Sequence, residues 1–462
     1  KWFASETQCK ETNQRFTESS LRGFSPRASA LLFSAQRKIA TILGAFNDVS
    51  SLHDCKWASG ATYDIKRVDA TLENKMSRTI SVTDRALPYL RKVIERDPHW
   101  FYTLTGVLPD GEFCVLPCVF KKTKGSRWLT VPKSAKTDRC IAAEPTGNSF
   151  LQQGLHNYMR RRLKRFGVDL DNQARNQHAA QCAYRDGFAT LDLSAASDSI
   201  SRNLVFHLLP IDWAFLMDDL RSAETRVDKT WIRTEKFVSM GNAFCFELES
   251  LIFYALARAV CGEDCTVEVY GDDIIVPQQH APELIELLEL CGFSINNEKS
   301  YTQGNFYESC GEHYHMGCNI TPAYQKNVID SSPERVRAHN RLVRLGLRLH
   351  HGRLRRCIRK LSKWMINTHP DPITPLIPFG SVGDDGYLVH PFALLKAYDR
   401  NHGFNCRVLI HRPKRRLVRK ECAYYAYKLR RSSFSNTLVT GHCATVVEGP
   451  HVYRRRWVSE SD

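Results

Sequence analysis

The sequence of 462 residues predicts an α+β fold in which helices pack against an antiparallel sheet. Apolar residues recur at helical spacing over 28–45 and 244–260. Short apolar runs at 188–193 and 266–277 are typical of strands, and the second run contains a Gly-Asp turn that indicates a hairpin. The C-terminal third is basic and helix-prone.

The elements between these follow from local signals. Residues 83–96 predict a helix that begins after Thr83 or Asp84. Residues 113–133 predict two strands joined by a basic turn that contains glycine. A basic helix is expected over 151–166, and another over 282–290 with Gly292 just past its end.

The positive charge of the chain is confined to its last part. The whole sequence has a formal net charge of +16, whereas residues 331–462 alone contain 26 Lys and Arg against 9 Asp and Glu. The helix-prone stretches 333–364 and 413–431 carry most of this excess. A near-neutral body with a basic C-terminal third indicates an enzyme with a region that holds a polyanion. The alternative is a solvated basic face that maintains solubility.

Two classes of protein are disfavoured by the sequence. No apolar run approaches the roughly 18 residues that cross a bilayer, since LIFYALA at 251–257 ends at Arg258. The polar opening segment does not resemble a secretory signal. Because it does not begin with Met, we expect the start of the natural chain to be missing.

The 16 cysteines lack the regular spacing of a secreted disulfide scaffold, and we expect free thiols. One cluster, Cys310, His313, His315 and Cys318, has the residue types of a zinc site. On a strand its two histidines would share one face, with little room for a tetrahedron. Packing and hairpin roles are therefore the main expectation, with zinc as the alternative.

Paired carboxylates mark the hairpin. Asp272 and Asp273 follow Gly271, and at a turn both side chains can approach the tip. Two such charges repel by about 4 kcal/mol at about 4 Å and an effective dielectric constant of about 20, so a cation would stabilise them. Hard oxygen ligands favour Mg²⁺. Ordinary turn chemistry is the alternative for an isolated Asp-Asp pair.

A third carboxylate has a matching context. Asp192 ends the apolar strand FATLD, where its side chain can lie at the rim of a sheet. If this strand neighbours the hairpin, Asp192 and Asp272 converge, with Asp273 close by. Three such acids could hold two cations about 3.5–4 Å apart, which is an arrangement used for phosphoryl transfer.

These residues lie in segments with a specific resemblance. YGDD at 270–273, the segment from Asp192 to Asp198 and SMGN at 239–242 resemble the palm motifs of RNA-directed RNA polymerases. WLTVPKSAKTDRCIAAEP at 128–145 and FYESCGEHY at 306–314 are similar to the replicase catalytic, or beta, subunit of positive-strand RNA bacteriophages (levivirus-like). The resemblance is strong over about 125–325, weaker before it, and faint after 330.

This resemblance implies a right-hand polymerase fold with an antiparallel-sheet palm, discontinuous fingers and a helical basic thumb. It places the N-terminal part of the fingers in 1–187 and the palm in 188–330, with a fingers insertion near 202–238. The thumb and C-terminal region would occupy 331–462.

The resemblance also implies catalytic residues. Asp192 and Asp272 would be the main ligands of two Mg²⁺ ions, which Mn²⁺ is expected to be able to replace, and Asp273 the accessory ligand. Lys299, in NNEKS, matches the lysine that protonates the pyrophosphate leaving group. An ordinary surface lysine accounts for this position equally well.

Other residues would bind the nucleotide. Asp198 resembles the acid that senses the ribose 2′-hydroxyl, with Ser239 and Asn242 as partners, although it follows Asp192 by one residue more than in the general polymerase pattern. Gly241 would give the template–nucleotide loop its backbone freedom.

The triphosphate would meet a basic segment that roofs the nucleotide channel. Lys133, Lys136 and Arg139 fit this role, because arginine grips phosphate oxygens bidentately. A solvated charge run is the alternative.

The implied function is RNA-directed RNA synthesis with primer-independent initiation in the cytoplasm of a bacterial host. The expected partners are template and product RNA, NTPs, host elongation factors Tu and Ts, and a small-subunit ribosomal protein. Two alternatives stay open. A reverse transcriptase shares the palm carboxylates but favours a bulky residue where LSAAS is small. A non-catalytic basic RNA-binding protein would leave Asp192, Asp272 and Asp273 unexplained.

Overall fold

The computed structural model describes most of the chain, in two compact units. The described residues are 2–47, 51–58, 60–70, 74–75, 79–97, 120–133, 137–325, 327–349, 352–381, 383–411, 414–418, 443–447 and 451–458. Unit 1 comprises Lys1–Cys310 with Val418–Cys443, and unit 2 comprises Gly311–Leu417 with Ala444–Asp462. The division into fingers, palm and thumb stays a prediction.

Unit 1 contains most of the predicted helices. Its helical elements are α1 (Trp2–Arg15), α2 (Glu18–Leu21), α3 (Pro26–Leu43), η1 (Arg67–Asp69), α6 (Leu87–Glu95), α8 (Thr146–Arg165), α9 (Ala174–Asp186), η2 (Ala196–Asp198), α10 (Arg202–Leu208), α11 (Ile211–Leu220), α12 (Cys245–Cys261), η3 (Gln278–His280) and α13 (Ala281–Leu290). Local signals explain the ends of α3: Ser25 Oγ accepts from Ala28 N–H, and Gly44 follows at φ +73°.

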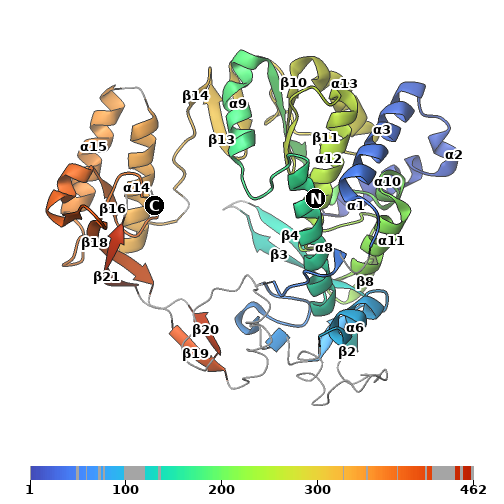
Figure 1. The fold of residues 1–462 in the computed structure, drawn as a ribbon, viewed down its shortest axis with the longest axis horizontal. Coiled ribbons are helices and arrows are strands. Elements are labelled where there is room, and N and C mark those ends of the chain that lie inside the picture. The colour runs from blue at the N-terminus through green and yellow to red at the C-terminus, as the bar shows by residue number, and fades with distance from the viewer. Residues whose placement is uncertain are drawn as a thin grey trace. The chain divides into compact units, whose positions relative to one another are not determined.

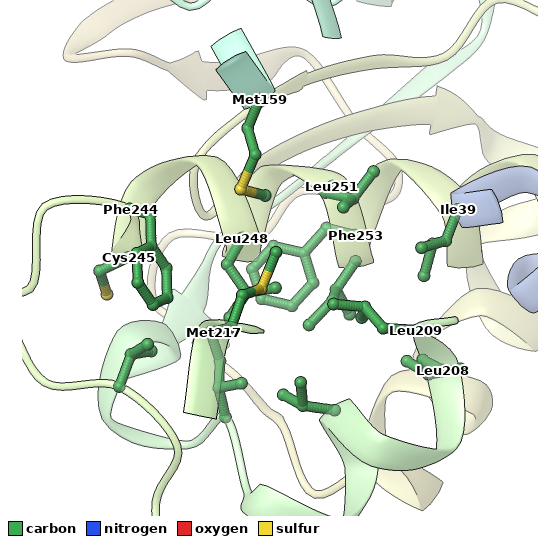
Figure 2. Packing of buried hydrophobic residues seen from close by; sticks show 14 of the residues in the cluster. Ile39, Met159, Leu208, Leu209, Met217, Phe244, Cys245, Leu248, Leu251 and Phe253 are labelled. Carbon is green, nitrogen blue, oxygen red and sulfur yellow. The ribbon is translucent and has the colours of Figure 1, made fainter. Parts of the chain in front are cut away.

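Helix α12 is the centre of the main core. Its residues from Leu248 to Ala257, which include the apolar run LIFYALA, are almost completely buried. The helix packs against α3, α8 and α13, and one side of it lies against β9 (Glu268–Tyr270) and β10 (Asp273–Pro277) (Figure 1). Figure 2 shows Leu248, Leu251 and Phe253 of this helix among side chains from other helices, including Met159.

Two sheets in unit 1 carry the predicted motifs. Antiparallel strands in the order β5-β10-β9 form the first, where β5 is Phe188–Leu191. The second has the order β4-β3-β7-β8, with a parallel pairing between β3 and β7. Its strands are β3 (Ser126–Pro132), β4 (Asp138–Ala143), β7 (Glu224–Val227) and β8 (Thr230–Arg233). The predicted insertion near 202–238 thus adds two strands to the 126–143 hairpin.

Shorter strand pairs complete unit 1. Strands β1 (Ile80–Val82) and β2 (Phe120–Lys122) pair in parallel, and β11 (Ser294–Ile295) pairs with β6 (Leu193–Ser194). Strand β12 spans Phe306–Ser309. The two strands predicted within 113–133 appear as β2 and β3, which pair with other strands and not with each other. Residues 113–119 lie outside the described part of the chain.

Unit 2 combines two basic helices with small sheets. The helical elements are α14 (Ser332–Arg348), α15 (Gly352–Asn367) and η4 (Pro391–Ala397). The strands are β13 (Glu312–His315), β14 (Cys318–Asn319), β15 (Leu376–Pro378), β16 (Tyr387–Val389), β17 (Tyr398–Asp399), β18 (Gly403–His411), β19 (Lys414–Val418), β20 (Cys443–Val447) and β21 (His451–Val458). Strands β19 and β20 pair with each other. The chain passes from unit 2 to unit 1 at the last residue of β19, and it returns to unit 2 after the first residue of β20.

Helices α14 and α15 confirm the helix prediction for 333–364. The helix predicted for 413–431 is wrong where the structure describes it, because Lys414–Val418 forms β19. Basic composition gave no signal of the strand pairing that overrides helix propensity there. The sheet formed by β17, β18 and β21 was not predicted, although its buried face, including Phe404, Cys406 and Val408, builds the core of unit 2.

The sequence also predicted free cysteines and disfavoured a membrane-spanning segment. The cysteines whose side chains the structure describes, from Cys9 to Cys406, are free thiols, as expected. Within the same residues, no helix combines the length and the apolar character needed to span a membrane.

Candidate active site

Strand register brings the three aspartates to one end of the β5-β10-β9 sheet. Leu191 of β5 pairs with Ile274 of β10, so Asp192 and Asp273 each lie one residue beyond this pair on neighbouring strands. Strands β9 and β10 are closed by Gly271 and Asp272, with Tyr270 opposite Asp273. The end of β5 thus supplies Asp192, and the turn between β9 and β10 supplies Asp272 and Asp273 at the same end of the sheet.

Gly271 allows this turn to form against α12. Its φ is +60°, a conformation that favours glycine. A Cβ atom here would lie 2.3 Å from Cε2 of Phe246, which is too close for any side chain. The Gly271 N–H donates to Oγ of Ser250, at 3.1 Å. Helix α12 thus fixes the backbone immediately before Asp272.

Asp192 is held by residues 296–301, a segment in which only Lys299 was predicted from the sequence to be functional. Asn296 donates from Nδ2 to Oδ2 of Asp192 at 2.5 Å, and the Asp192 N–H donates to Oγ of Ser300 at 3.0 Å. Backbone bonds between Thr190 and Tyr301 hold this segment beside β5. Burial raises the pKa of Asp192, while the Asn296 hydrogen bond and the Lys299 charge act to lower it. Asn296 and Ser300 both belong to the NNEKS segment that contains Lys299, and this proximity in sequence could have indicated them.

Asp273 is the third acid at this end of the sheet, and its surroundings raise its pKa. Burial, together with the nearby carboxylates of Asp272 and Asp192, raises its pKa to about 6. The Ser309 hydroxyl donates to Oδ1 at 3.3 Å and acts in the opposite direction. A cation at this end of the sheet would relieve the repulsion among the carboxylates.

Lys299 lies within electrostatic reach of all three aspartates. Burial acts to lower its pKa, but the carboxylates of Asp192 and Glu308 outweigh burial, and its pKa is raised. Its Nζ lies 3.7 Å from Oε1 of Glu308, and 52% of the side chain is exposed. The structure therefore places a protonated, accessible amine beside the acids.

Oxygen donors at this site have the chemistry that Mg²⁺ prefers. In the described part of the chain, no three His, Cys, Asp or Glu side chains are grouped tightly enough to hold a metal ion by themselves. This finding covers the aspartates and also Cys310, His313, His315 and Cys318, so the zinc alternative gains no support. Mg²⁺ is commonly bound by one or two carboxylates together with substrate phosphates, which fits an incomplete protein site.

Asp198 has a partner that the sequence did not reveal. Lys236 Nζ lies 2.7 Å from Asp198 Oδ1, and the lysine is completely buried. The same ammonium lies 3.6 Å from Oε1 of Glu6 and 4.5 Å from the ring centre of Trp2. Helix α1 thus covers the pair. Twelve percent of the Asp198 side chain stays exposed.

The predicted partners of Asp198 make other contacts. Asn242 accepts from Phe244 N–H through Oδ1, at 3.0 Å, and its Nδ2 is buried without a hydrogen bond. The Ser239 carbonyl accepts from Asn242 N–H. In the described residues, the side-chain donor to the Asp198 carboxylate is thus Lys236 in place of Ser239 or Asn242.

Gly241 connects this loop to the second sheet. It has φ +118°, and a Cβ there would lie 2.1 Å from the Ala142 carbonyl oxygen of β4. Ala142 N–H donates to the Met240 carbonyl at 2.7 Å. Close backbone approach therefore adds a second reason for glycine. Lys133 and Arg139 are exposed at the end of the β3–β4 hairpin where the chain passes from β3 to β4, and Lys136 lies outside the described residues.

Comparisons with known proteins show which family this chain belongs to. The family described as RNA replicase, beta-chain, matches residues 1–373. The chain is 36% identical to the RNA-directed RNA polymerase subunit beta of Escherichia virus Qbeta, covering 97% of the chain and 74% of that protein. It is 37% identical to the corresponding subunit of Enterobacteria phage SP and 38% identical to that of Enterobacteria phage fr. These alignments cover 75% and 69% of the chain, respectively, and 59% of each relative.

Among solved structures, the RNA-dependent RNA polymerase of a human picobirnavirus matches with a TM-score of 0.45 and 15% identity, covering 75% of this chain and 71% of that one. The polymerase of BmCPV at its elongation state matches with a TM-score of 0.44 and 11% identity, covering 74% and 33%.

Proposed function

Because the chain belongs to the RNA replicase beta-chain family, we propose that it is the nucleotidyl-transfer subunit of an RNA-directed RNA polymerase of a positive-strand RNA bacteriophage. The reaction joins the 3′-hydroxyl of growing RNA to the α-phosphate of an NTP and releases pyrophosphate. The observation that carries the proposal is the gathering of Asp192, Asp272 and Asp273 at one sheet end beside Lys299.

Asp192 and Asp272 would hold two Mg²⁺ ions, with Asp273 as the accessory ligand. When bound, these ions would activate the attacking hydroxyl and neutralise charge on the phosphates. Asn296 and Ser300 hold Asp192 in place before any substrate arrives. This preorganisation lowers the cost of forming the reactive geometry. Mn²⁺ shares the preference for oxygen ligands and is expected to replace Mg²⁺.

Lys299 would donate a proton to the leaving pyrophosphate. The neighbouring carboxylates that raise its pKa keep it protonated at neutral pH, which is the state an acid requires. Its half-exposed side chain can reach a ligand in the site.

The sugar and the triphosphate would meet different residues. Asp198, which is paired with Lys236, would accept from the ribose 2′-hydroxyl. The unpaired Nδ2 of Asn242 is a donor that a ribose oxygen would satisfy, since a buried unpaired donor is costly. Lys133 and Arg139, with Lys136, would bind the phosphates.

The basic helices α14 and α15 of unit 2 would hold template and product RNA. Elongation factors Tu and Ts and a small-subunit ribosomal protein are proposed as host partners, with the bacterial cytoplasm as the place of action. Initiation without a primer is part of the same proposal.

The test is Mg²⁺-dependent incorporation of NTPs on an RNA template without primer, with and without bacterial extract. Incorporation that needs both RNA and Mg²⁺ supports the proposal, and a dependence on extract supports the host factors. Preference for dNTPs would favour reverse transcription. RNA binding without incorporation under either condition would contradict catalysis.

A further inference from the structure

We propose that Glu249 is a positioning residue that ties the loop after Asp192 to the turn before Asp272. This inference rests on the proposed function, because it concerns how the two carboxylates are held for a divalent cation. Glu249 is on α12, behind the sheet end, and 3% of the residue is exposed. It therefore acts through its neighbours and does not itself touch substrate.

One oxygen of Glu249 binds the loop that follows Asp192. The Ser197 hydroxyl donates to Oε2 of Glu249 at 2.6 Å. Ser197 lies in η2 (Ala196–Asp198), which α12 contacts directly. The preceding residue, Ala196, is buried in the main core, so the loop has little room to shift independently of α12.

The other oxygen lies against the turn. Oε1 is 3.1 Å from the position that a Cβ of Gly271 would occupy. The next residue on the helix, Ser250, accepts from Gly271 N–H and donates to the Phe246 carbonyl at 2.7 Å. The Phe246 ring packs edge-on against Tyr270, with ring centres 5.1 Å apart. Two consecutive residues of one helix therefore touch both carboxylate-bearing segments.

Glu249 differs from the other buried glutamate on the same helix. Glu247 is paired with Arg160 and His156. Among the described residues, Glu249 has a hydroxyl partner and no cationic one. Burial raises the pKa of Glu249 to about 8, so it adds little negative charge to the site at pH 7. Its Gln variant is accordingly a conservative replacement that keeps the acceptor.

The test compares three variants of the full chain, Glu249→Gln, Glu249→Ala and Ser197→Ala. The first readout is Mn²⁺ binding measured by electron paramagnetic resonance without RNA or NTP. The second is hydrogen–deuterium exchange over 266–277. We expect Glu249→Ala and Ser197→Ala each to weaken Mn²⁺ binding about 10-fold, the usual effect of losing a residue that orients a ligand. Exchange at Gly271 should become faster in Glu249→Ala, and Glu249→Gln should resemble the parent chain.

A double variant and a matched control separate positioning from general damage. If the two side chains act as one unit, Ser197→Ala with Glu249→Ala should be no weaker than either single variant. Ser199→Ala is the control, because Ser199 Oγ lies in the same loop but donates to the Ala195 carbonyl, at 3.0 Å, and not to Glu249. It should bind Mn²⁺ normally.

Several outcomes would overturn the inference. Unchanged Mn²⁺ binding in a folded Ser197→Ala variant removes the coupling, and so does an equal effect of Ser199→Ala. If Glu249→Ala does not fold, Ser197→Ala decides alone, since it removes one hydroxyl. A parent chain that binds Mn²⁺ but incorporates no NTP contradicts the proposed function and leaves the positioning result standing.

Discussion

Lys236 Nζ lies 2.7 Å from Asp198 Oδ1, and the lysine side chain has no exposed surface. Glu6 and the ring of Trp2 complete the surroundings of the ammonium group. The N-terminal helix α1 is therefore part of the environment of an acid in the segment after β5. A buried charge with two carboxylate neighbours and an aromatic face is well compensated, whereas removal of one partner leaves the others unpaired.

Lys236→Met should destabilise the chain strongly. The substitution keeps a long side chain but leaves Asp198 and Glu6 buried without their cation, which costs about 3–5 kcal/mol in comparable pairs. Urea unfolding followed by circular dichroism would measure the change. Lys229→Met, at an exposed turn position between β7 and β8, is the control and should stay within about 0.5 kcal/mol of the parent.

Asp198→Ala should reduce discrimination between ribo- and deoxyribonucleotides more than it reduces total metal-dependent incorporation. The exposed part of Asp198 is available to a ribose hydroxyl, while the metal is held elsewhere. The measurement is the ratio of kcat/KM for an NTP and its dNTP. An unchanged ratio in a folded variant would remove Asp198 from the nucleotide site.

Asp272→Asn should abolish incorporation and leave RNA binding nearly intact. The amide keeps the shape of the turn but removes the negative charge that attracts the cation, whereas the basic helices of unit 2 hold RNA. Incorporation assays and filter binding measure the two effects. Asp264→Asn, in the exposed segment before β9, is the matched control and should remain active.

Metal activation should weaken as the pH falls through about 6. Burial and the neighbouring carboxylates raise the pKa of Asp273 to about 6 in the metal-free site, so protons compete with the cation below that value. The half-saturating Mg²⁺ concentration should rise by up to about tenfold per pH unit there. Asp273→Asn should flatten this dependence.

The same shift has a consequence for metal-free stability. The folded-state pKa of Asp273 is raised above its ordinary value of 3.8, so ionising Asp273 opposes folding. The stability associated with this group is therefore full below 3.8 and is lost as the pH rises through about 6. Urea midpoints of the parent and of Asp273→Asn, compared at pH 5 and 7 without metal, check the sign.

Neutralising α15 should lower the salt dependence of RNA binding. Arg359 and Lys363 are exposed and one helical turn apart, so both can meet one RNA backbone. Losing two phosphate contacts in Arg359→Gln with Lys363→Gln should flatten the slope of log K against log salt by about 1.4–1.8. Lys10→Gln with Arg22→Gln, exposed residues of unit 1, should leave the slope unchanged. An unchanged slope in the α15 variant would assign this face to solvent or to a protein partner.

The local pattern of apolar residues was sufficient to predict the helices that it places in the core. The apolar spacing of 28–45 and 244–260 predicted α3 and α12 to within two residues. The Gly-Asp turn predicted the β9–β10 hairpin, because glycine at positive φ is a local requirement. Propensity failed for 414–418, where strand pairing decided the structure.

The sequence by itself determined the membership in the replicase family and the identity of three carboxylates at a strand end and a turn. Both depend on the order and spacing of residues along the chain. Only the tertiary structure decided what holds those carboxylates and the loop that follows Asp192. Asn296 reaches Asp192 across 104 positions, Ser197 reaches Glu249 across 52, and Lys236 reaches Asp198 across 38. Such contacts follow no local periodicity, because they exist only once helices and strands pack and bury the polar groups that must then find partners.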